Sequence, residues 1–394
     1  MSGFELLLRE EAPQVLSALV RHYGHFDLAE EAVQEALLAA AQQWPEEGVP
    51  DNPRGWLIRV GSRRLTDLLR SDSARRKREE NAANLAAPEE FVAAGPEIDD
   101  PGGQDDTLTL LFLCCHPALS AASQIALTLR AVGGLSTAQI AAAFLVPETT
   151  MAQRISRAKR TVSGVRFDRP GDVATVLRVL YLVFNEGYSG EVDLAAEAIR
   201  LTRQLASVID HPEVAGLLAL MLLHHARRNA RITLNGSLIP LAEQDRSRWD
   251  TEAIAEGVEV LQSALVRDRL GEFQAQAAIA ALHADAPSVD ETDWVQIVEW
   301  YDELVRLTDS PVARLNRAVA VGEADGPRAG LAALAELDES LPRHAAVAAY
   351  LHEQDGDLAA AAVLYAEAAE KATSLAEREH LTRQSARLHA RLRR

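Results

Sequence analysis

Hydrophobic residues recur at intervals of three and four through most of the chain, the spacing that places them on one face of an α-helix. Amphipathic helices of this kind are expected at residues 4–22, 26–44 and 56–70, and again between residues 107 and 162. The alternation of hydrophobic and polar residues that is typical of a strand is scarce. The pattern therefore predicts an all-α fold.

The segment from Gly133 to Val162 has the pattern of a helix-turn-helix. Ser136 and Thr137 offer oxygens that can cap a first helix, and Leu-Val-Pro-Glu at 145–148 interrupts it. A second helix follows, and its apolar stripe consists of Met151, Ile155, Ala158 and Val162.

Another face of that second helix carries the hydrogen-bonding and cationic groups that contact bases and phosphates in a major groove. These groups belong to Thr150, Gln153, Arg154, Arg157 and Thr161. A solvated surface helix with arginines is the alternative interpretation. The motif favours DNA binding over that alternative.

Two helices nearer the amino terminus carry opposite charge. In residues 26–44, Val33 and Leu37 belong to a core stripe, and an acidic face interrupted by Leu38 lies opposite. That face either binds a partner or contacts only solvent. In residues 56–70, leucines lie on one side and arginines on the other.

Two side chains of this basic helix have predicted contacts. Asp67 follows Arg63 by four residues, a spacing that allows the two to pair across one helical turn. Trp56 is either a core anchor, which the periodicity favours, or a stacking surface for an unpaired base.

The net charge of −18 is unevenly distributed. Residues 54–78 contain nine basic and two acidic side chains, whereas residues 81–106 contain seven acidic and no basic ones. Residues 171–394 carry 22 Lys+Arg against 35 Asp+Glu, a net charge of −13. Since local rather than total charge attracts a phosphate backbone, the acidic total is compatible with nucleic-acid binding.

Composition narrows the class of protein. A length of 394 residues predicts two or three domains. Apolar residues make up 48% of the chain, which is enough for substantial cores. The amino-terminal segment does not have the pattern of a signal peptide, and no apolar window reaches the length of a membrane span. We therefore predict a cytoplasmic protein that does not bind a membrane. Cys114 and Cys115 precede His116, but adjacent helical side chains point about 100° apart, so buried thiols are favoured over a metal site. We expect no metal and no other cofactor.

The order of these parts resembles a group IV (extracytoplasmic-function) RNA polymerase sigma factor. DLAEEAVQEALLAA is similar to the family's region 2.1–2.2, NPRGWLIRVGSRRLTDLLR to its regions 2.3–2.4, and residues 133–162 to its region 4. The resemblance covers about residues 5–165. It implies a region 2 bundle and a region 4 helix-turn-helix joined by a flexible tether. Its implied partners are core RNA polymerase and promoter DNA, both double-stranded and melted.

The resemblance also implies roles for individual residues. Core-polymerase binding is implied for Asp27, Glu30, Glu31, Gln34 and Glu35. Proximity to the −10 element is implied for Trp56, Arg59, Arg63, Arg64 and Arg70. Proximity to the −35 element is implied for Thr149, Thr150, Gln153, Arg154, Arg157 and Lys159. Arg63 departs from the family pattern, in which many members carry asparagine.

The remainder of the chain is predicted to be a helical, tetratricopeptide-like extension. A turn sequence at Glu323–Gly326 recurs thirty residues later at 353–356, and an alanine-rich helix follows each. LYLVFNEGYS, LLALMLLHHARRNAR, EQDRSRWD and LNRAVAV resemble the carboxy-terminal extension of one sigma subgroup. The apolar run 176–184 is expected to pack on residues 107–165. The junction is assigned to Asn185, Glu186, Gly187 and Tyr188.

Side chains of the extension do not favour catalysis. His224 and His225 lack the i, i+4 spacing of a helical metal pair. Arg246, Arg248 and Asp250 are interpreted as an ion network around Trp249. We therefore expect no enzymatic activity.

The predicted domains are region 2 (1–80), an acidic flexible linker (81–106), region 4 (107–168) and a regulatory extension (169–394). The predicted function is promoter-specific transcription initiation within RNA polymerase, modulated by the extension. A small cytoplasmic regulatory protein is a further candidate partner. The alternative is an autonomous helix-turn-helix activator with a helical-repeat sensor domain.

Overall fold

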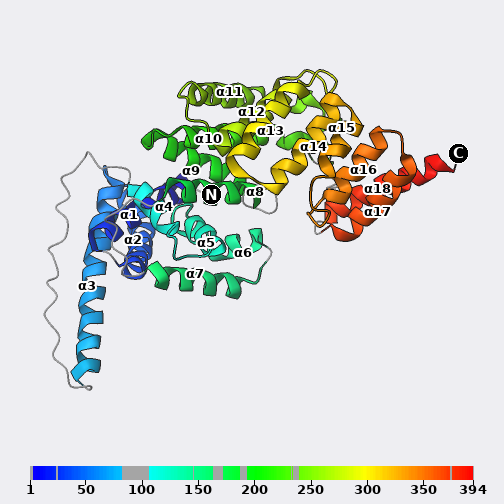
Figure 1. Ribbon diagram of the computed structural model, residues 1–394. Coiled ribbons are helices and arrows are strands. Elements are labelled where there is room, and N and C mark those ends of the chain that lie inside the picture. Colours follow the sequence, from blue (N-terminus) through cyan, green and yellow to red (C-terminus); the bar gives the residue numbers. More distant parts are fainter. Residues whose placement is uncertain are drawn as a thin grey trace. The chain divides into compact units, whose positions relative to one another are not determined.

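The fold is all-α, as the hydrophobic pattern predicts (Figure 1). The computed structural model describes residues 3–23, 25–81, 106–144, 146–162, 172–186, 193–231, 233, 239–372 and 375–393. Across these ranges the chain forms eighteen α-helices and three short 3-10 turns, without a β-strand. Two compact units divide the chain, Met1–Val208 and Ile209–Arg394. Residues 82–105 of the expected linker lie outside the described residues.

The amino-terminal bundle consists of α1 (Gly3–Tyr23), α2 (Phe26–Glu47) and α3 (Pro53–Asn81). Its three helices pack against one another. Gly61 permits the close approach of α3 to α1, because a Cβ at this position would lie 2.9 Å from Leu19 Cδ1. The carboxy-terminal half of α3 runs past α1 and α2 (Figure 1). The core of the bundle includes Val15, Leu19, Phe26, Val33, Leu57 and Leu65.

The helix-turn-helix domain follows. Its helices are α4 (Asp106–Cys114), α5 (Ala121–Ala131), α6 (Thr137–Ala143) and α7 (Glu148–Val162). Ser136 caps α6 as its sequence position predicts. The Ser136 hydroxyl accepts a hydrogen bond from the Gln139 amide, and the Gln139 side chain accepts one from the Ser136 amide. This reciprocal cap determines where the first helix of the motif begins.

Two further helices, α8 (Val173–Glu186) and α9 (Leu194–Val208), belong to the first compact unit. The apolar face of α8 packs on α4 and α5, which confirms the expected packing of residues 176–184. A Cβ on Gly133, just after α5, would lie 3.2 Å from the Glu197 carboxylate of α9. The compact units divide after Val208, because α8 and α9, the first helices of the predicted extension, pack with the helix-turn-helix domain.

The second unit begins with α10 (Pro212–Ala226), which is buried along most of its length. It packs against α11 (Thr251–Leu265) and α12 (Glu272–Asp285). The approach to α12 is close at Gly216, where a Cβ would lie 2.7 Å from the backbone nitrogen of Gln274. The later helices are α13 (Trp294–Thr308), α14 (Pro311–Asp325), α15 (Pro327–Leu334), α16 (His344–Gln354), α17 (Leu358–Lys371) and α18 (Leu375–Leu392).

The two similar turn sequences of the second unit form similar structures. Gly326 follows α14 with φ of 96°, and Gly356 follows α16 with φ of 86°, a conformation that favours glycine. The side chains of Arg328 and Asp355 form an ion pair at 3.0 Å. Successive helices then pack in order along the chain, as a repeat architecture requires.

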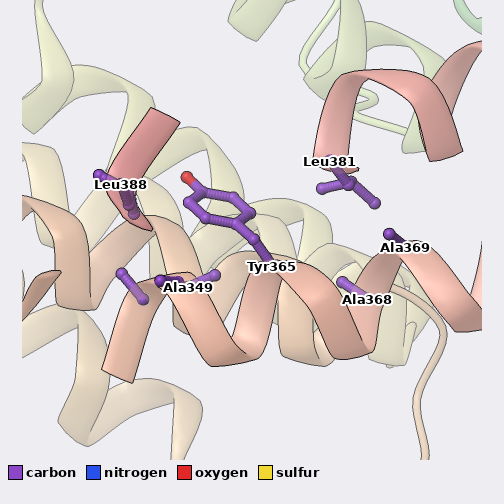
Figure 2. Close-up of a cluster of buried hydrophobic side chains, with 8 residues drawn as sticks. Ala349, Tyr365, Ala368, Ala369, Leu381 and Leu388 are labelled. Atoms are coloured by element: carbon purple, nitrogen blue, oxygen red, sulfur yellow. The ribbon is translucent and has the colours of Figure 1, made fainter. Parts of the chain in front are cut away.

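Small side chains allow the last helices of this unit to pack closely. Tyr365 fills the space between α16, α17 and α18, and alanines surround it (Figure 2). The buried cluster consists of Ala349, Ala361, Ala362, Tyr365, Ala368, Ala369, Leu381 and Leu388.

Truncation tests the place where the first unit ends. A chain of residues 1–208 should unfold cooperatively, whereas residues 1–170 should lose stability because the cores of α4 and α5 become exposed to solvent. Each large side chain that α8 contributes, such as Phe184, stabilises the fold by about 1.5–3 kcal/mol when buried. Chemical denaturation monitored by circular dichroism measures the difference. Equal stability of the two fragments would contradict the assignment of α8 and α9 to this unit.

Candidate nucleic-acid interface

The second helix of the motif, α7, has one buried and one open side. Its apolar stripe of Met151, Ile155, Ala158 and Val162 is buried, as its spacing predicts. The opposite side presents the side chains of Thr149, Thr150, Gln153 and Arg157 to solvent, with Arg154 half-buried beside them. These five predicted −35 residues form one continuous polar and cationic surface, called here the α7 outer face.

Lys159, the sixth predicted −35 residue, lies elsewhere on the helix. It lies next to the buried stripe because it is four residues from Ile155, and one helical turn brings the two side chains to the same side. The Lys159 ammonium donates a hydrogen bond to the carboxylate of Glu30 on α2. The Arg130 guanidinium of α5 lies 3.3 Å from the same carboxylate.

Helix α3 presents a cationic strip. Trp56, Arg59, Arg63 and Arg70 occur at i, i+3, i+7 and i+14, which aligns them on one side, and the three arginines are exposed. Trp56 is half-buried and meets Trp44 edge to face, with ring centroids 5.3 Å apart. The ring of Trp56 is therefore anchored by the core and also reaches the surface.

Two charged side chains of α3, Arg64 and Asp67, form ion pairs outside this strip or along it. Arg64 points toward α2, and its Nε lies 3.1 Å from a carboxylate oxygen of Glu35. The prediction that Asp67 pairs with Arg63 is wrong, because the Asp67 carboxylate lies 4.0 Å from Arg70 instead. Spacings of three and four residues both bring helical side chains together, and the sequence does not distinguish them.

The acidic face of α2 has an open centre and occupied edges. The side chains of Asp27, Glu31 and Gln34 are exposed. Leu38, on the same face, is 59% exposed, which is unusual for a leucine and is typical of a contact surface. At the edges, Glu30 pairs with Lys159 and Arg130, and Glu35 pairs with Arg64.

The adjacent cysteines belong to the core of the helix-turn-helix domain. Cys114 and Cys115 are buried, as predicted. Burial raises the pKa of both thiols, that of Cys115 to about 12. The Gln124 side-chain amide donates hydrogen bonds to the Cys115 and His116 carbonyls. The sequence pattern did not identify this contact, because it depends on how α4 and α5 pack. No group of three or more potential metal ligands occurs in the described part of the chain.

Two buried histidines of the second unit, His224 and His283, have lowered pKa values. Burial, with smaller contributions from Arg227 and other positive neighbours, lowers the pKa of His224 to about 3. Burial likewise lowers the pKa of His283 to about 4.

The predicted ion network around Trp249 is replaced by other contacts. The Arg246 guanidinium lies 4.5 Å from the Trp249 ring centroid, and its Nη1 donates to the His283 and Ala286 carbonyls. Asp250 caps α11 by accepting bonds from backbone amides, and Arg248 is exposed. Local capping competes with ion pairing for an aspartate at a helix start.

The remaining predicted site, the junction, is partly described. Asn185 and Glu186 are exposed at the end of α8, and Gly187 and Tyr188 lie outside the described residues.

Within the described residues, no helix is long and apolar enough to cross a membrane.

Comparisons with known families match three successive parts of the chain. Residues 7–75 match sigma-70 region 2, and residues 109–162 match sigma-70 region 4. Residues 172–265 match a family of unknown function (DUF6596). The first two matches coincide with the amino-terminal bundle and the helix-turn-helix domain. The third includes α8 to α11.

Two relatives extend the comparison. An uncharacterized protein of Rhizobium meliloti (strain 1021) is 44% identical over 355 residues, which cover 86% of this chain and 84% of that protein. A probable ECF RNA polymerase sigma factor, SigI, of Mycobacterium tuberculosis is 29% identical over 194 residues, or 44% of this chain and 64% of the relative. No solved structure matches. Since both sigma-70 regions occur in this order on the two helical domains, the chain belongs to the sigma-70 family, as an extracytoplasmic-function type factor with an additional carboxy-terminal domain.

Proposed function

We propose that this protein binds core RNA polymerase and directs it to a specific set of promoters. The observation that carries the proposal is that an acidic, leucine-containing face and two cationic helices occur on domains that match sigma-70 regions 2 and 4. A factor of this kind recognises DNA and positions an enzyme but catalyses no reaction itself. Such a role places the protein in the cytoplasm.

Each surface has a proposed role. The α2 face, centred on Asp27, Glu31 and Gln34, docks on the polymerase, with Glu30 and Glu35 at its edges. The α3 strip lies along the −10 element, where its arginines contact phosphates and Trp56 stacks on an unpaired base. Arg64 is proposed to join this strip when its ion pair with Glu35 breaks. The −10 residues are Trp56, Arg59, Arg63, Arg64 and Arg70.

The α7 outer face is proposed to enter the major groove of the −35 element, with the amino-terminal end of the helix nearest the bases. Arg154 and Arg157 are the side chains able to bind guanine through two hydrogen bonds. Lys159 is directed away from this face, so it contacts a flanking phosphate only after leaving Glu30.

The additional domain is proposed to modulate initiation. Its first helices complete the core of the helix-turn-helix domain, so a change in the domain can affect the −35 helix through α8. We propose the same domain limits as the sequence predicts. Region 2 covers residues 1–80, the linker covers 81–106, region 4 covers 107–168, and the extension begins at residue 169. A small cytoplasmic regulatory protein is a candidate ligand for the extension.

Reconstituted transcription tests the proposed function. Purified full-length protein and core RNA polymerase are incubated with a library of promoter fragments, and transcripts are sequenced. The proposal predicts transcripts that start at a defined subset of fragments and require both components. DNA binding without polymerase, together with no effect on transcription by core polymerase, would instead favour an autonomous activator.

The α7 outer face yields a prediction about DNA. Arg154→Ala and Arg157→Ala should each weaken promoter use by about 1–3 kcal/mol, because each removes a contact with a base edge. Binding to core polymerase should not change. Arg178→Ala on α8 is the matched control, since it removes an exposed arginine outside α7. Unaltered transcription by the double variant would show that α7 is only a solvated helix.

The α2 face yields a prediction about polymerase. Glu31→Lys with Gln34→Lys should weaken core association about tenfold or more, because two positive charges enter the centre of the face and one carboxylate is lost. The fold should be preserved, since both side chains are exposed. Glu46→Lys with Glu47→Lys, at the exposed end of the same helix, is the control. Association as strong as that of the wild type would mean that the face contacts only solvent.

A further inference from the structure

Helix α13 of the second unit has one edge that is occupied within the chain and one that is open. Its buried side chains, such as Ile297 and Leu304, pack with residues of α12 and α14. On one edge, Asp302 pairs with Arg317 of α14 at 2.5 Å. The other edge borders a hollow of about 380 Å³, which is lined by Gln296, Glu299, Trp300 and Glu303. Their spacing of i, i+3, i+4 and i+7 places the four on one side of the helix, called here the α13 groove.

Trp300 gives the α13 groove an anchored aromatic wall. The side chain is half-buried and packs on the core that α12, α13 and α14 share. The core therefore holds the ring in place, while the rest of the ring lines the hollow. Leu307, two helical turns further along the same side, is 36% exposed. A ring that is already held in place loses little side-chain entropy when a partner covers it.

Two carboxylates make the α13 groove acidic. Glu299 is exposed, and none of the described cations pairs with it. Glu303 pairs with Arg306 on the same helix, but the two side chains remain 42% and 65% exposed. Exposed pairs at this spacing contribute little stability, so an incoming cation can replace Arg306 at low cost. The groove therefore offers two carboxylates beside one aromatic ring.

We propose that the α13 groove binds an arginine-rich segment of a partner protein. An arginine guanidinium can stack on an aromatic ring and donate paired hydrogen bonds to a carboxylate. Glu303 follows Trp300 by three residues, so its carboxylate lies beside the ring on the helix surface. The hollow is at the lower end of the range for small-ligand sites, about 300–1,000 Å³. It holds one long side chain and its neighbours rather than a packed helix.

Charge distinguishes this partner from other classes of ligand. Glu299 and Glu303 repel phosphate groups, and they belong to a part of the chain, residues 171–394, with a net charge of −13. Nucleic acids and anionic small molecules are therefore poor ligands for the α13 groove. A cationic protein segment complements both the carboxylates and the aromatic ring.

The inference adds a chemistry to the regulatory partner of the extension, and it rests on the proposed function in that respect alone. Binding of a cationic segment to the α13 groove requires neither polymerase nor DNA. The binding therefore succeeds or fails independently of promoter recognition.

Peptide binding to the full-length protein tests the α13 groove. The probe is a fluorescein-labelled peptide in which three arginines alternate with glycine and serine, and its fluorescence anisotropy is measured at physiological salt. Matched peptides carry lysine or the neutral arginine analogue citrulline in place of arginine. The arginine peptide should bind most tightly, because lysine lacks the planar fork and citrulline lacks the charge. An arginine peptide that binds no more tightly than either of the others would overturn the proposal.

Variants separate the α13 groove from the general acidity of the chain. Glu299→Gln with Glu303→Gln should weaken binding of the arginine peptide by about tenfold or more. Trp300→Phe keeps an aromatic ring and should weaken it by about threefold. Glu336→Gln with Glu339→Gln is the matched control, because it removes the same charge from two exposed positions after α15. Circular dichroism should show that all variants are folded. Equal weakening by the two double variants would mean nonspecific attraction and would overturn the site.

Two further measurements separate the proposal from its alternatives. If light scattering shows a dimer that Glu299→Gln with Glu303→Gln dissociates, a second copy of the chain occupies the α13 groove and the proposal is wrong. Normal promoter-specific transcription without arginine-peptide binding would overturn the groove alone. Arginine-peptide binding without promoter-specific transcription would support the groove and contradict the proposed function.

Discussion

Burial of one apolar stripe determines where the charged side chains of α3 and of α7 point. On α7 the burial of Met151, Ile155 and Ala158 forces Arg157 outward and leaves Lys159 at the boundary. On α3 the burial of Leu57 and Leu65 has the same effect on the arginine strip. Since a helix cannot rotate without exposing its stripe, these surfaces are fixed in direction by the core.

The same constraint explains how an acidic protein can bear DNA-binding surfaces. A net charge of −18 repels a phosphate backbone at long range, but screening limits that effect to about 10 Å at ordinary salt. Cations gathered on two helix faces therefore act locally. Polymerase, which holds the protein close to DNA, would make the long-range repulsion unimportant.

Features that depend on the neighbours within one helix were predictable from the sequence. The capping role of Ser136 and the buried stripe of α7 follow from local spacing, and both are confirmed. The apolar run of α8 was too hydrophobic to remain exposed, and its packing on α4 and α5 is confirmed as well.

Features that depend on distant partners were not predictable in the same way. Lys159 and Glu30 are 129 residues apart, and their contact depends on the packing of α2 against α7. The position of Arg246 over Trp249, in place of an ion pair, depends on the carbonyls of the α12 end that attract the guanidinium. The boundary after Val208 depends on the core that α8 shares with α4 and α5.

Site-specific cross-linking to DNA is the most direct test of the central claim that two surfaces of one chain act together within polymerase. A photoreactive residue is placed at Trp56 or at Thr150, and cross-links to a promoter fragment are mapped with and without core polymerase. The account predicts that both positions cross-link to the same fragment at two separate places, and only when polymerase is present. Cross-linking from Thr150 alone, equally efficient without polymerase, would contradict it.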